Sequence, residues 1–202
     1  LRQHPICIVT HKECDISVYN RIAKEEGIVL LYNHFDKSYF SSTESYNALC
    51  LSTDFYERFS NYKYMLICQL DVWIFRDEVI EWCSKGYDYI GAPWLLRPIY
   101  NFPLLKFTSW TKRKYCQFTS RPCSQMTRFK VGNGGLSLRK VSSHLKAVTY
   151  LRSIIKQYLQ VRNHLFNEDV FFSIEVNRHG LNFTYPSWQE ALQFSFDKYP
   201  SL

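Results

Sequence analysis

The segment YMLICQLD, residues 64–71, is an almost continuous apolar run that ends in a carboxylate. A strand this apolar belongs at the centre of a sheet that is covered on both faces. In open α/β sheets, ligands bind outside the carboxyl ends of such strands. Gln69 and Asp71 point to the same side of an extended chain, and a carboxylate beside an amide oxygen suits a hard cation that also takes phosphate oxygens. The alternative is that Asp71 merely begins a turn before Phe75.

The segments before this run predict a strand, a helix and a second strand, at residues 6–10, 16–26 and 28–32. Gly27 follows the helix at the position where a left-handed residue commonly ends one. A strand–helix–strand unit implies parallel strands. We therefore expect an α/β fold with a mixed, mainly parallel sheet flanked by helices. The sequence has no internal repeat or dividing linker, so residues 1–202 are expected to form a single domain.

Two polar segments further along the chain are candidates for binding and catalysis. Gly132-Asn133-Gly134-Gly135 predicts a backbone turn, since three glycines in four residues imply positive φ or the close approach of a ligand. A plain hairpin explains this run about as well. Asn167-Glu168-Asp169 opens an apolar helix, where carboxylates commonly complement the helix dipole. The alternative is that one of these carboxylates faces the cleft as a general base.

The net charge of +7 is unevenly distributed along the chain. Residues 89–166 hold 14 of the 25 Lys and Arg and none of the 18 Asp and Glu, so the remainder is net negative. Such segregation favours a positive face for phosphates, anionic lipid headgroups or nucleic acid, and a solvated face without a partner is the alternative. Within this stretch, residues 95–130 are aromatic, basic and interrupted by proline. Because they show no sustained period, they predict an inserted loop.

Several function classes have little support in the sequence. No run approaches the ~20 apolar residues of a membrane-spanning helix, and the first residues lack the apolar block of a signal peptide. The seven cysteines contain no CxxC pair, which favours reduced thiols in a cytosolic setting over disulfides. The six histidines have no ligand spacing, and no GxSxG or HExxH motif supports a hydrolase or protease.

Taken together, the ordered motifs resemble a family of GT-A-like glycosyltransferases that is catalogued as a domain of unknown function. The matching motifs are the run 46–94, which includes FYERFSNYKYMLICQLDVWIFRDEVIEWCSKGYDYIGAPW, then VGNGGLSLRK at 131–140 and NEDVFF at 167–172. The resemblance covers most of the chain outside the 95–130 insertion. Any one of these motifs alone would be weak, whereas their order along the chain is specific.

The resemblance implies a nucleotide-sugar donor, with a UDP-sugar favoured, and a divalent cation, Mn²⁺ or Mg²⁺, held through the donor diphosphate. The DxD-type motif of GT-A enzymes corresponds to Gln69-Leu70-Asp71 here, which leaves Asp71 as the strong metal ligand. By the same resemblance, Asn133-Gly134-Gly135 lines the donor or acceptor pocket. By analogy with inverting enzymes of this fold, Asp169 is the candidate catalytic base and Glu168 is the second choice.

The acceptor implied by the resemblance is a glycan or a lipid-linked hydroxyl, and an anionic membrane surface is a candidate partner of a cytoplasmic, peripheral enzyme. Similar sequences begin with an additional strand and continue to a segment with a His and a Trp, so truncation at both ends is expected. Two alternatives remain: a non-catalytic relative, and a module that binds an anionic surface or nucleic acid through residues 89–166. Nucleic acid is the less favoured partner, although the stretch contains rings that would stack on bases, namely Phe107, Trp110, Tyr115 and Phe118.

Overall fold

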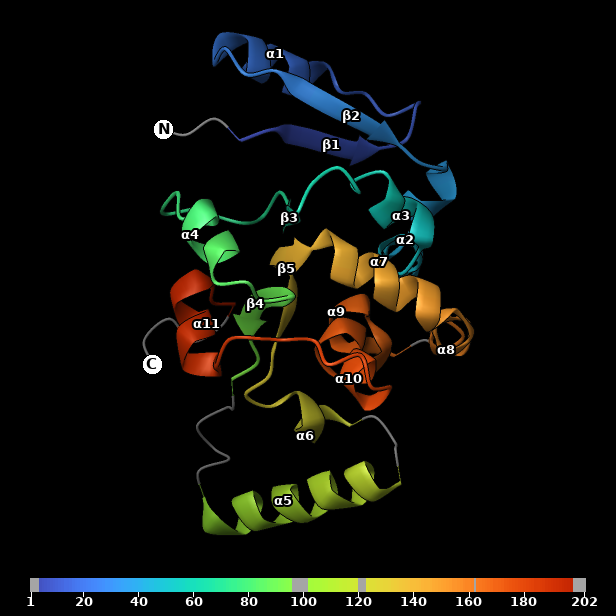
Figure 1. The fold of residues 1–202 in the computed structure, drawn as a ribbon, viewed down its shortest axis with the longest axis vertical. Helices are drawn as coiled ribbons and strands as arrows, with labels where there is room; N and C mark the ends of the chain where they lie inside the picture. Colours follow the sequence, from blue (N-terminus) through green and yellow to red (C-terminus); the bar gives the residue numbers. More distant parts are fainter. Residues whose placement is uncertain (1–3, 96–101, 120–122, 162, 198–202) are drawn as a thin grey trace.

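The computed structural model describes residues 4–95, 102–119, 123–161 and 163–197. They form two small β-sheets and a set of helices, so the expected α/β class is confirmed at the level of a mixed α/β fold (Figure 1). The two-stranded N-terminal sheet lies at one end of the longest axis, and helix α5 (Pro103–Phe118) lies at the other. The three-stranded sheet lies between them.

The first strand–helix–strand unit has the expected parallel pairing. Strand β1 (Ile6–Thr10), helix α1 (Ser17–Glu25) and strand β2 (Leu30–His34) follow one another, and β1 pairs in parallel with β2. The second strand begins two residues later than predicted, because the residues just after the helix form its C-terminal cap. Gly27 adopts φ 65°, and the Ile28 N–H donates to a carbonyl of α1 at 2.7 Å. This is the 6→1 bond of a Schellman helix end.

The second sheet departs from the mainly parallel pairing that the sequence predicts. Its strands are β3 (Tyr64–Cys68), β4 (Tyr89–Pro93) and β5 (Val131–Lys140), in the order β3-β5-β4. Strand β5 pairs antiparallel with both neighbours. Because β3 and β4 both run against β5, they share one direction, as expected for strands joined through helix α4 (Val79–Ser84). The prediction is wrong for this sheet because the returning strand β5 takes the place between them.

Residues 132–135 belong to strand β5 and do not form the turn that their glycines predict. None of these three described glycines has positive φ. The missing side chains instead allow close packing, since a Cβ on Gly132 would overlap the indole ring of Trp94. The neighbouring strand is equally close, because a Cβ on Gly91 would lie 2.6 Å from the carbonyl oxygen of Asn133. Close approach, and not a left-handed backbone, is therefore the use of glycine here.

The predicted 95–130 loop is largely helical where the structure describes it. Helix α5 (Pro103–Phe118) has proline in its first turn, where backbone N–H groups have no acceptor within the helix, so the missing N–H costs no hydrogen bond. The short helix α6 (Ser124–Thr127) follows. Residues 96–101 and 120–122 of the predicted loop lie outside the described residues. The loop prediction is wrong for α5 because basic residues stand between its apolar positions and obscure the helical period.

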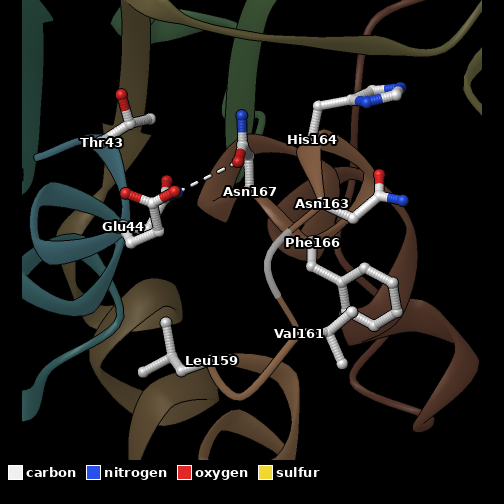
Figure 2. Close-up of a pocket in the computed structure, with 9 residues that line it drawn as sticks. Thr43, Glu44, Leu159, Val161, Asn163, His164, Phe166 and Asn167 are labelled. Atoms are coloured by element: carbon white, nitrogen blue, oxygen red, sulfur yellow. Dashed lines mark hydrogen bonds between the residues drawn. The ribbon is translucent and has the colours of Figure 1, made fainter.

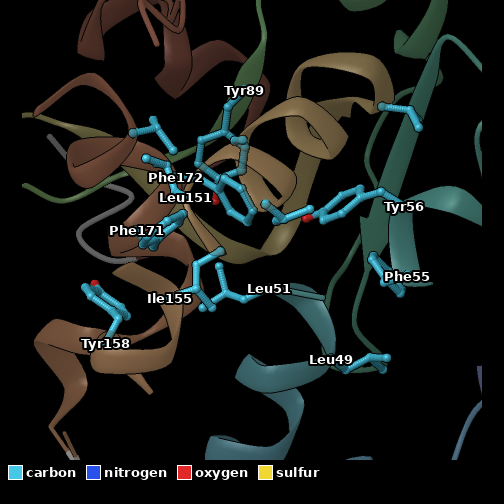
Figure 3. Packing of buried hydrophobic residues seen from close by; sticks show 14 of the residues in the cluster. Leu49, Leu51, Phe55, Tyr56, Tyr89, Leu151, Ile155, Tyr158, Phe171 and Phe172 are labelled. Atoms are coloured by element: carbon cyan, nitrogen blue, oxygen red, sulfur yellow. The ribbon is translucent and has the colours of Figure 1, made fainter. Parts of the chain in front are cut away.

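Most of the remaining helices pack around the main hydrophobic core (Figure 3). Their bounds are η1 (Lys37–Phe40), α2 (Thr43–Cys50), α3 (Thr53–Glu57), α7 (Val141–Tyr150), α8 (Arg152–Tyr158) and η3 (His164–Phe166). Helix α11 (Trp188–Phe194) packs on a second, smaller cluster, where the ring of Phe194 lies edge-on to Trp82.

One further helical segment contains a widened turn. Helices α9 (Glu168–Val170) and α10 (Val176–Arg178) flank a π-helical stretch, η4 (Phe171–Glu175). Phe172 in this stretch is fully buried and packs edge-on against Tyr56, whose ring centroid is 6.0 Å away (Figure 3). π-helical turns are rare and occur often at functional sites. This one directly follows the two carboxylates that the sequence marks as candidates.

Two general properties accompany this fold. All seven cysteines lie in the described part of the chain and none is in a disulfide, which agrees with the prediction of reduced thiols. Across the described ranges, no helix has the length and apolar character needed to cross a membrane.

Candidate functional site

Gln69, Asn133 and Gly135 meet at the carboxyl end of β3, where the sequence predicts a donor site. The Gln69 N–H donates to the Gly135 carbonyl at 2.9 Å, which extends the β3–β5 pairing by one residue. The Asn133 side-chain oxygen accepts from the Gly135 N–H, also at 2.9 Å. A Cβ on Gly135 would lie 3.1 Å from Gln69 Oε1 and 3.3 Å from Asn133 Oδ1. The two amide oxygens therefore converge on this glycine.

A buried ion pair lies against the preceding glycine. A Cβ on Gly134 would overlap Glu168 Oε1, so only glycine permits this approach. The same oxygen accepts from Arg139 Nη2 at 2.9 Å, and both side chains are almost completely buried. Arg139 also donates to Ser137 Oγ and to the Tyr56 hydroxyl, each at 3.0 Å. Burying an ion pair is unfavourable unless further hydrogen bonds satisfy the charged groups, and these two partners contribute to that.

Glu168 is also held through its backbone. Asn47, buried on α2, accepts from the Glu168 N–H at 3.1 Å and donates to the Asn167 side chain at 3.1 Å. The second carboxylate oxygen, Oε2, is buried and has no hydrogen-bond partner within the described ranges. Because buried polar atoms are nearly always paired, an unpaired one points to a water, an ion or a ligand that completes the site.

Asp169 stands beside the ion pair in a different environment. It is half-buried, and burial raises the pKa of its carboxyl to about 7, with the charge of Glu168 adding to the shift. The N–H groups of Val170, at 2.7 Å, and of Gly134 oppose this rise because they favour the charged form. The two neighbouring carboxylates therefore differ: Glu168 is held in an ion pair, whereas Asp169 exchanges its proton near neutral pH.

Asp71, the predicted metal ligand, is exposed in the turn after β3. Its charge acts on the thiol of Cys68, whose pKa is raised first by burial and second by Asp71. No hydrogen bond or ion pair joins Asp71 to Glu168 or Asp169 in the part of the chain that the structure describes. Within the same residues, no three His, Cys, Asp or Glu side chains come together as a metal site. The structure thus brings the glycines, amides and candidate base together and leaves Asp71 separate.

The residues around Asp71 expose large apolar side chains. Leu70, Trp73 and Phe75 are 84%, 78% and 75% exposed. Contiguous exposed apolar groups mark binding surfaces more often than single ones do, and aromatic rings suit stacking on a sugar or a base. The sequence signal was the run VWIF at 72–75, which stands between two acidic residues.

Comparison with protein families matches residues 30–202 to DUF5672, which is described as a protein of unknown function. The match covers most of the chain and every residue of the candidate site. The chain belongs to the DUF5672 family. Among curated proteins and solved structures, none matches it significantly.

Two central residues of this DUF5672 site, Arg139 and Asn47, were not predicted from the sequence. For Arg139 a signal was present, because Ser137 and Arg139 alternate with leucines in LSLRK. On a strand covered on both faces, such polar residues have to find buried partners. Asn47 carried no comparable signal, since a single amide is unremarkable in a short amphipathic helix.

A pocket of about 240 Å³ adjoins the site of this DUF5672 domain and shares Asn47 and Asn167 with it (Figure 2). The dashed line in Figure 2 is the hydrogen bond between these two side chains. Polar groups of Thr43, Glu44 and His164 also line the pocket. Of the candidate segment 167–169 it contains only Asn167, so a ligand there would touch the residue that precedes the two carboxylates.

Proposed function

We propose that this DUF5672 domain is a glycosyltransferase that moves a sugar from a nucleotide-sugar donor to an acceptor hydroxyl with the help of a divalent cation. The observation that carries the proposal is the Asp169 carboxyl, whose pKa is raised to about 7 beside Gly134. A general base works best when its pKa lies near the working pH. The neighbouring residues Gln69 and Asn133 lie at the carboxyl end of β3, where α/β sheets bind ligands.

Asp169 would take the proton of the acceptor hydroxyl as its oxygen attacks the anomeric carbon of the donor sugar. The bond from that carbon to the diphosphate oxygen breaks as the glycosidic bond forms, and the nucleoside diphosphate leaves with the bonding electrons. Such a single displacement inverts the anomeric centre. Glu168 is a positioning residue in this scheme, because its carboxylate is buried in the pair with Arg139 and its charge contributes to the raised pKa of Asp169.

The donor would lie along Gln69 and the Asn133-Gly134-Gly135 run, where missing side chains let phosphate or sugar oxygens approach the backbone. Asp71 is the residue that would hold Mn²⁺ or Mg²⁺. Mg²⁺ commonly uses one or two carboxylates together with substrate phosphates and not an all-protein cage, and a single exposed Asp71, two residues after Gln69 in the chain, fits that mode. When bound, the cation would neutralise charge that develops on the departing diphosphate.

A GT-A arrangement of the sheet is part of this proposal. Two features support it: the parallel β1–α1–β2 unit, and the shared direction of β3 and β4 on either side of β5. The parallel pair and the three-stranded sheet are separate sheets here, so the mainly parallel sheet of the GT-A fold rests on the resemblance. The preference for a UDP-sugar and for a glycan or lipid-linked acceptor rests on that resemblance alone.

Calorimetry with UDP, GDP and CMP, with and without Mn²⁺, tests the donor site. We expect one nucleotide to bind only in the presence of Mn²⁺, and Asp71→Ala to weaken that binding at least about tenfold, because the variant loses the carboxylate that holds the cation. Asp15→Ala is the matched control, since it removes another exposed carboxylate, before α1, and should bind like the wild type. If none of the three nucleotides binds, the glycosyltransferase proposal fails.

Asp169→Asn separates the chemical step from donor binding. This variant should keep the affinity for the nucleotide and lose about a hundredfold or more in turnover, the usual contribution of a general base. Turnover is measured as release of nucleoside diphosphate from the matching nucleotide sugar. Equal turnover by the variant would remove Asp169 from the role of base, and donor binding without turnover by the wild type would identify a non-catalytic relative.

A further inference from the structure

Helix α5 turns its apolar side chains away from the rest of the protein. Its inner face carries Ser109, Arg113 and Cys116, of which the first two are half-buried and Cys116 is 6% exposed. The helix packs mainly on the short helix α6, and Figure 1 shows it at the end of the molecule opposite the N-terminal sheet. A surface helix normally buries its apolar stripe against the core, so the orientation of α5 is the reverse of the usual one.

The outer face of α5 carries four large apolar side chains, Leu104, Phe107, Tyr115 and Phe118, which form a stripe that Thr111 interrupts. At ~3.6 residues per turn these positions fall within one narrow sector of the helix. Their side chains are between 58% and 90% exposed. Trp110 lies beside Phe107, with the two ring centroids 6.2 Å apart. Several large exposed apolar side chains on one face of a helix favour an interaction surface.

Cations border this stripe, and acidic residues are missing around it. At ~100° per residue, Lys112 and Lys114 fall on opposite sides of the stripe, and both are exposed. Residues 89–166 contain no Asp or Glu, so the segment offers no acid to pair with either lysine. Lysines bordering an apolar stripe are typical of helices that lie in the interface of an anionic membrane, where long side chains reach the headgroups.

The length of α5 fits the same interpretation. Its 16 residues make a helix ~24 Å long, which is shorter than the ~30 Å hydrocarbon layer of a bilayer. A helix of this length with several cations cannot span the bilayer, but it can lie flat with one face in the boundary between headgroups and acyl chains.

We propose that α5 docks this chain on an anionic lipid bilayer through the stripe of Leu104, Phe107, Tyr115 and Phe118. A second copy seated on the same stripe fits less well, because the lysines of both copies would meet with no carboxylate in either segment to pair them. A nucleic acid would favour rings interleaved with cations along a groove, whereas here the rings share one face and the cations lie at its borders.

The docking helix is joined to the candidate site by a short stem. The Trp94 N–H donates to the Lys130 carbonyl at 3.0 Å, and the Phe129 N–H donates to the Trp94 carbonyl at 2.9 Å. These bonds close the excursion directly beyond β4, and the Trp94 ring lies over Gly132, next to Asn133. A bilayer that holds α5 would therefore suit a lipid-linked acceptor. That consequence rests on the proposed function, whereas the docking itself does not.

Vesicle flotation measures the docking without any assay of activity. Residues 1–202 should float with vesicles that contain about 30% phosphatidylserine and bind at least about tenfold more weakly to pure phosphatidylcholine. Phe107→Ser with Phe118→Ser should weaken binding about a hundredfold or more, because the variant lacks two aromatic rings whose transfer from water into the bilayer favours binding. Val29→Ser with Tyr150→Ser is the matched control, since it removes two exposed apolar side chains elsewhere and should bind like the wild type. Circular dichroism checks that all variants are folded.

The electrostatic contribution has its own pair of variants. Lys112→Gln with Lys114→Gln should weaken binding to the anionic vesicles about thirtyfold, since each basic residue near such a surface contributes roughly a factor of five. Arg21→Gln with Lys24→Gln removes the same charge from exposed positions of α1 and should stay within about twofold of the wild type.

Three results would overturn the docking proposal. The first is a wild-type chain that floats with neither kind of vesicle. The second is binding to a single-stranded oligonucleotide, in place of vesicles, that the same substitutions abolish. The third is a dimer, detected by light scattering, that Phe107→Ser with Phe118→Ser converts to a monomer while no vesicle binding is seen.

Discussion

Asp169→Asn should make the protein more stable at alkaline pH while it removes the proposed base. The pKa of the Asp169 carboxyl is raised to about 7 in the folded chain from an ordinary value of 3.8. Above that pH the folded chain carries a charge that burial and Glu168 disfavour, whereas the unfolded chain ionises freely. A difference of about 3 pKa units corresponds to about 4 kcal/mol of unfolding free energy. Asparagine is neutral and similar in shape, and its oxygen can still accept from the Val170 N–H.

The pH dependence supplies the sign of this effect. Below about pH 4 the wild-type carboxyl is protonated in both states, so wild type and variant should be similarly stable. As the pH rises to about 7, the unfolded carboxyl releases its proton first, and the wild type loses stability that the variant keeps. Chemical denaturation at about pH 5 and about pH 8 should show the advantage of Asp169→Asn growing by roughly 3 kcal/mol.

Asp36→Asn is the control for this measurement, because hydrogen bonds from Ser38 lower the pKa of the Asp36 carboxyl. Removing the Asp36 carboxylate should therefore lower the unfolding free energy at about pH 8, whereas Asp169→Asn should raise it. If Asp169→Asn is no more stable than the wild type at that pH, the raised pKa is refuted. A variant that gains stability and loses turnover would show that a destabilising group is retained for chemistry.

Three further predictions concern the network around this carboxyl. Gly134→Ala should lower the unfolding free energy by about 3 kcal/mol, because its methyl would displace the buried Glu168–Arg139 pair. Gly135→Ala is the control in the same denaturation assay. It should lower the unfolding free energy less, because its methyl would meet only amide side-chain ends at 3.1 and 3.3 Å. Glu168→Gln should also lose about 3 kcal/mol, since it leaves Arg139 buried without a counter-charge, and adding Arg139→Met should recover part of the loss in a double-mutant cycle. His144→Phe should reduce the loss of stability in acid. Burial lowers the pKa of His144 to about 3 from 6.5, so below pH 6.5 the unfolded wild type takes up a proton that the folded chain does not, and this favours unfolding. Unfolding free energies at about pH 4 and about pH 7, compared between variant and wild type, measure the difference.

Local features of the fold were predictable from the sequence because they depend on residues close together in the chain. The apolar runs at 6–10 and 64–68 predicted strands β1 and β3, which the structure contains. Gly27 predicted a helix end, and it adopts a positive φ of 65°. The same local reasoning placed Gln69 and Asp71 at the carboxyl end of a strand, and Gln69 directly follows β3.

Pairing and packing were less predictable, because they depend on which distant segments meet. Nothing near residues 131–140 indicates that this strand lies between β3 and β4 and runs against both. The glycines within it predicted a turn, and they serve instead for contact with Trp94 and Glu168, which come from elsewhere in the chain. The sequence predicts a loop at helix α5 because basic residues stand between its apolar positions and obscure the helical period.

The sequence by itself determined the first strand–helix–strand unit, the strand that ends before Gln69, and the segregation of charge. Only the tertiary structure distinguished Glu168 from Asp169. The two are adjacent carboxylates with the same neighbours in sequence. Glu168 forms a buried ion pair with Arg139, whereas Asp169 is half-buried beside it and forms no ion pair among the residues that the structure describes. A pKa depends on burial and on charges within a few ångströms. Those quantities are set by a contact between residues 29 positions apart, which no local pattern contains.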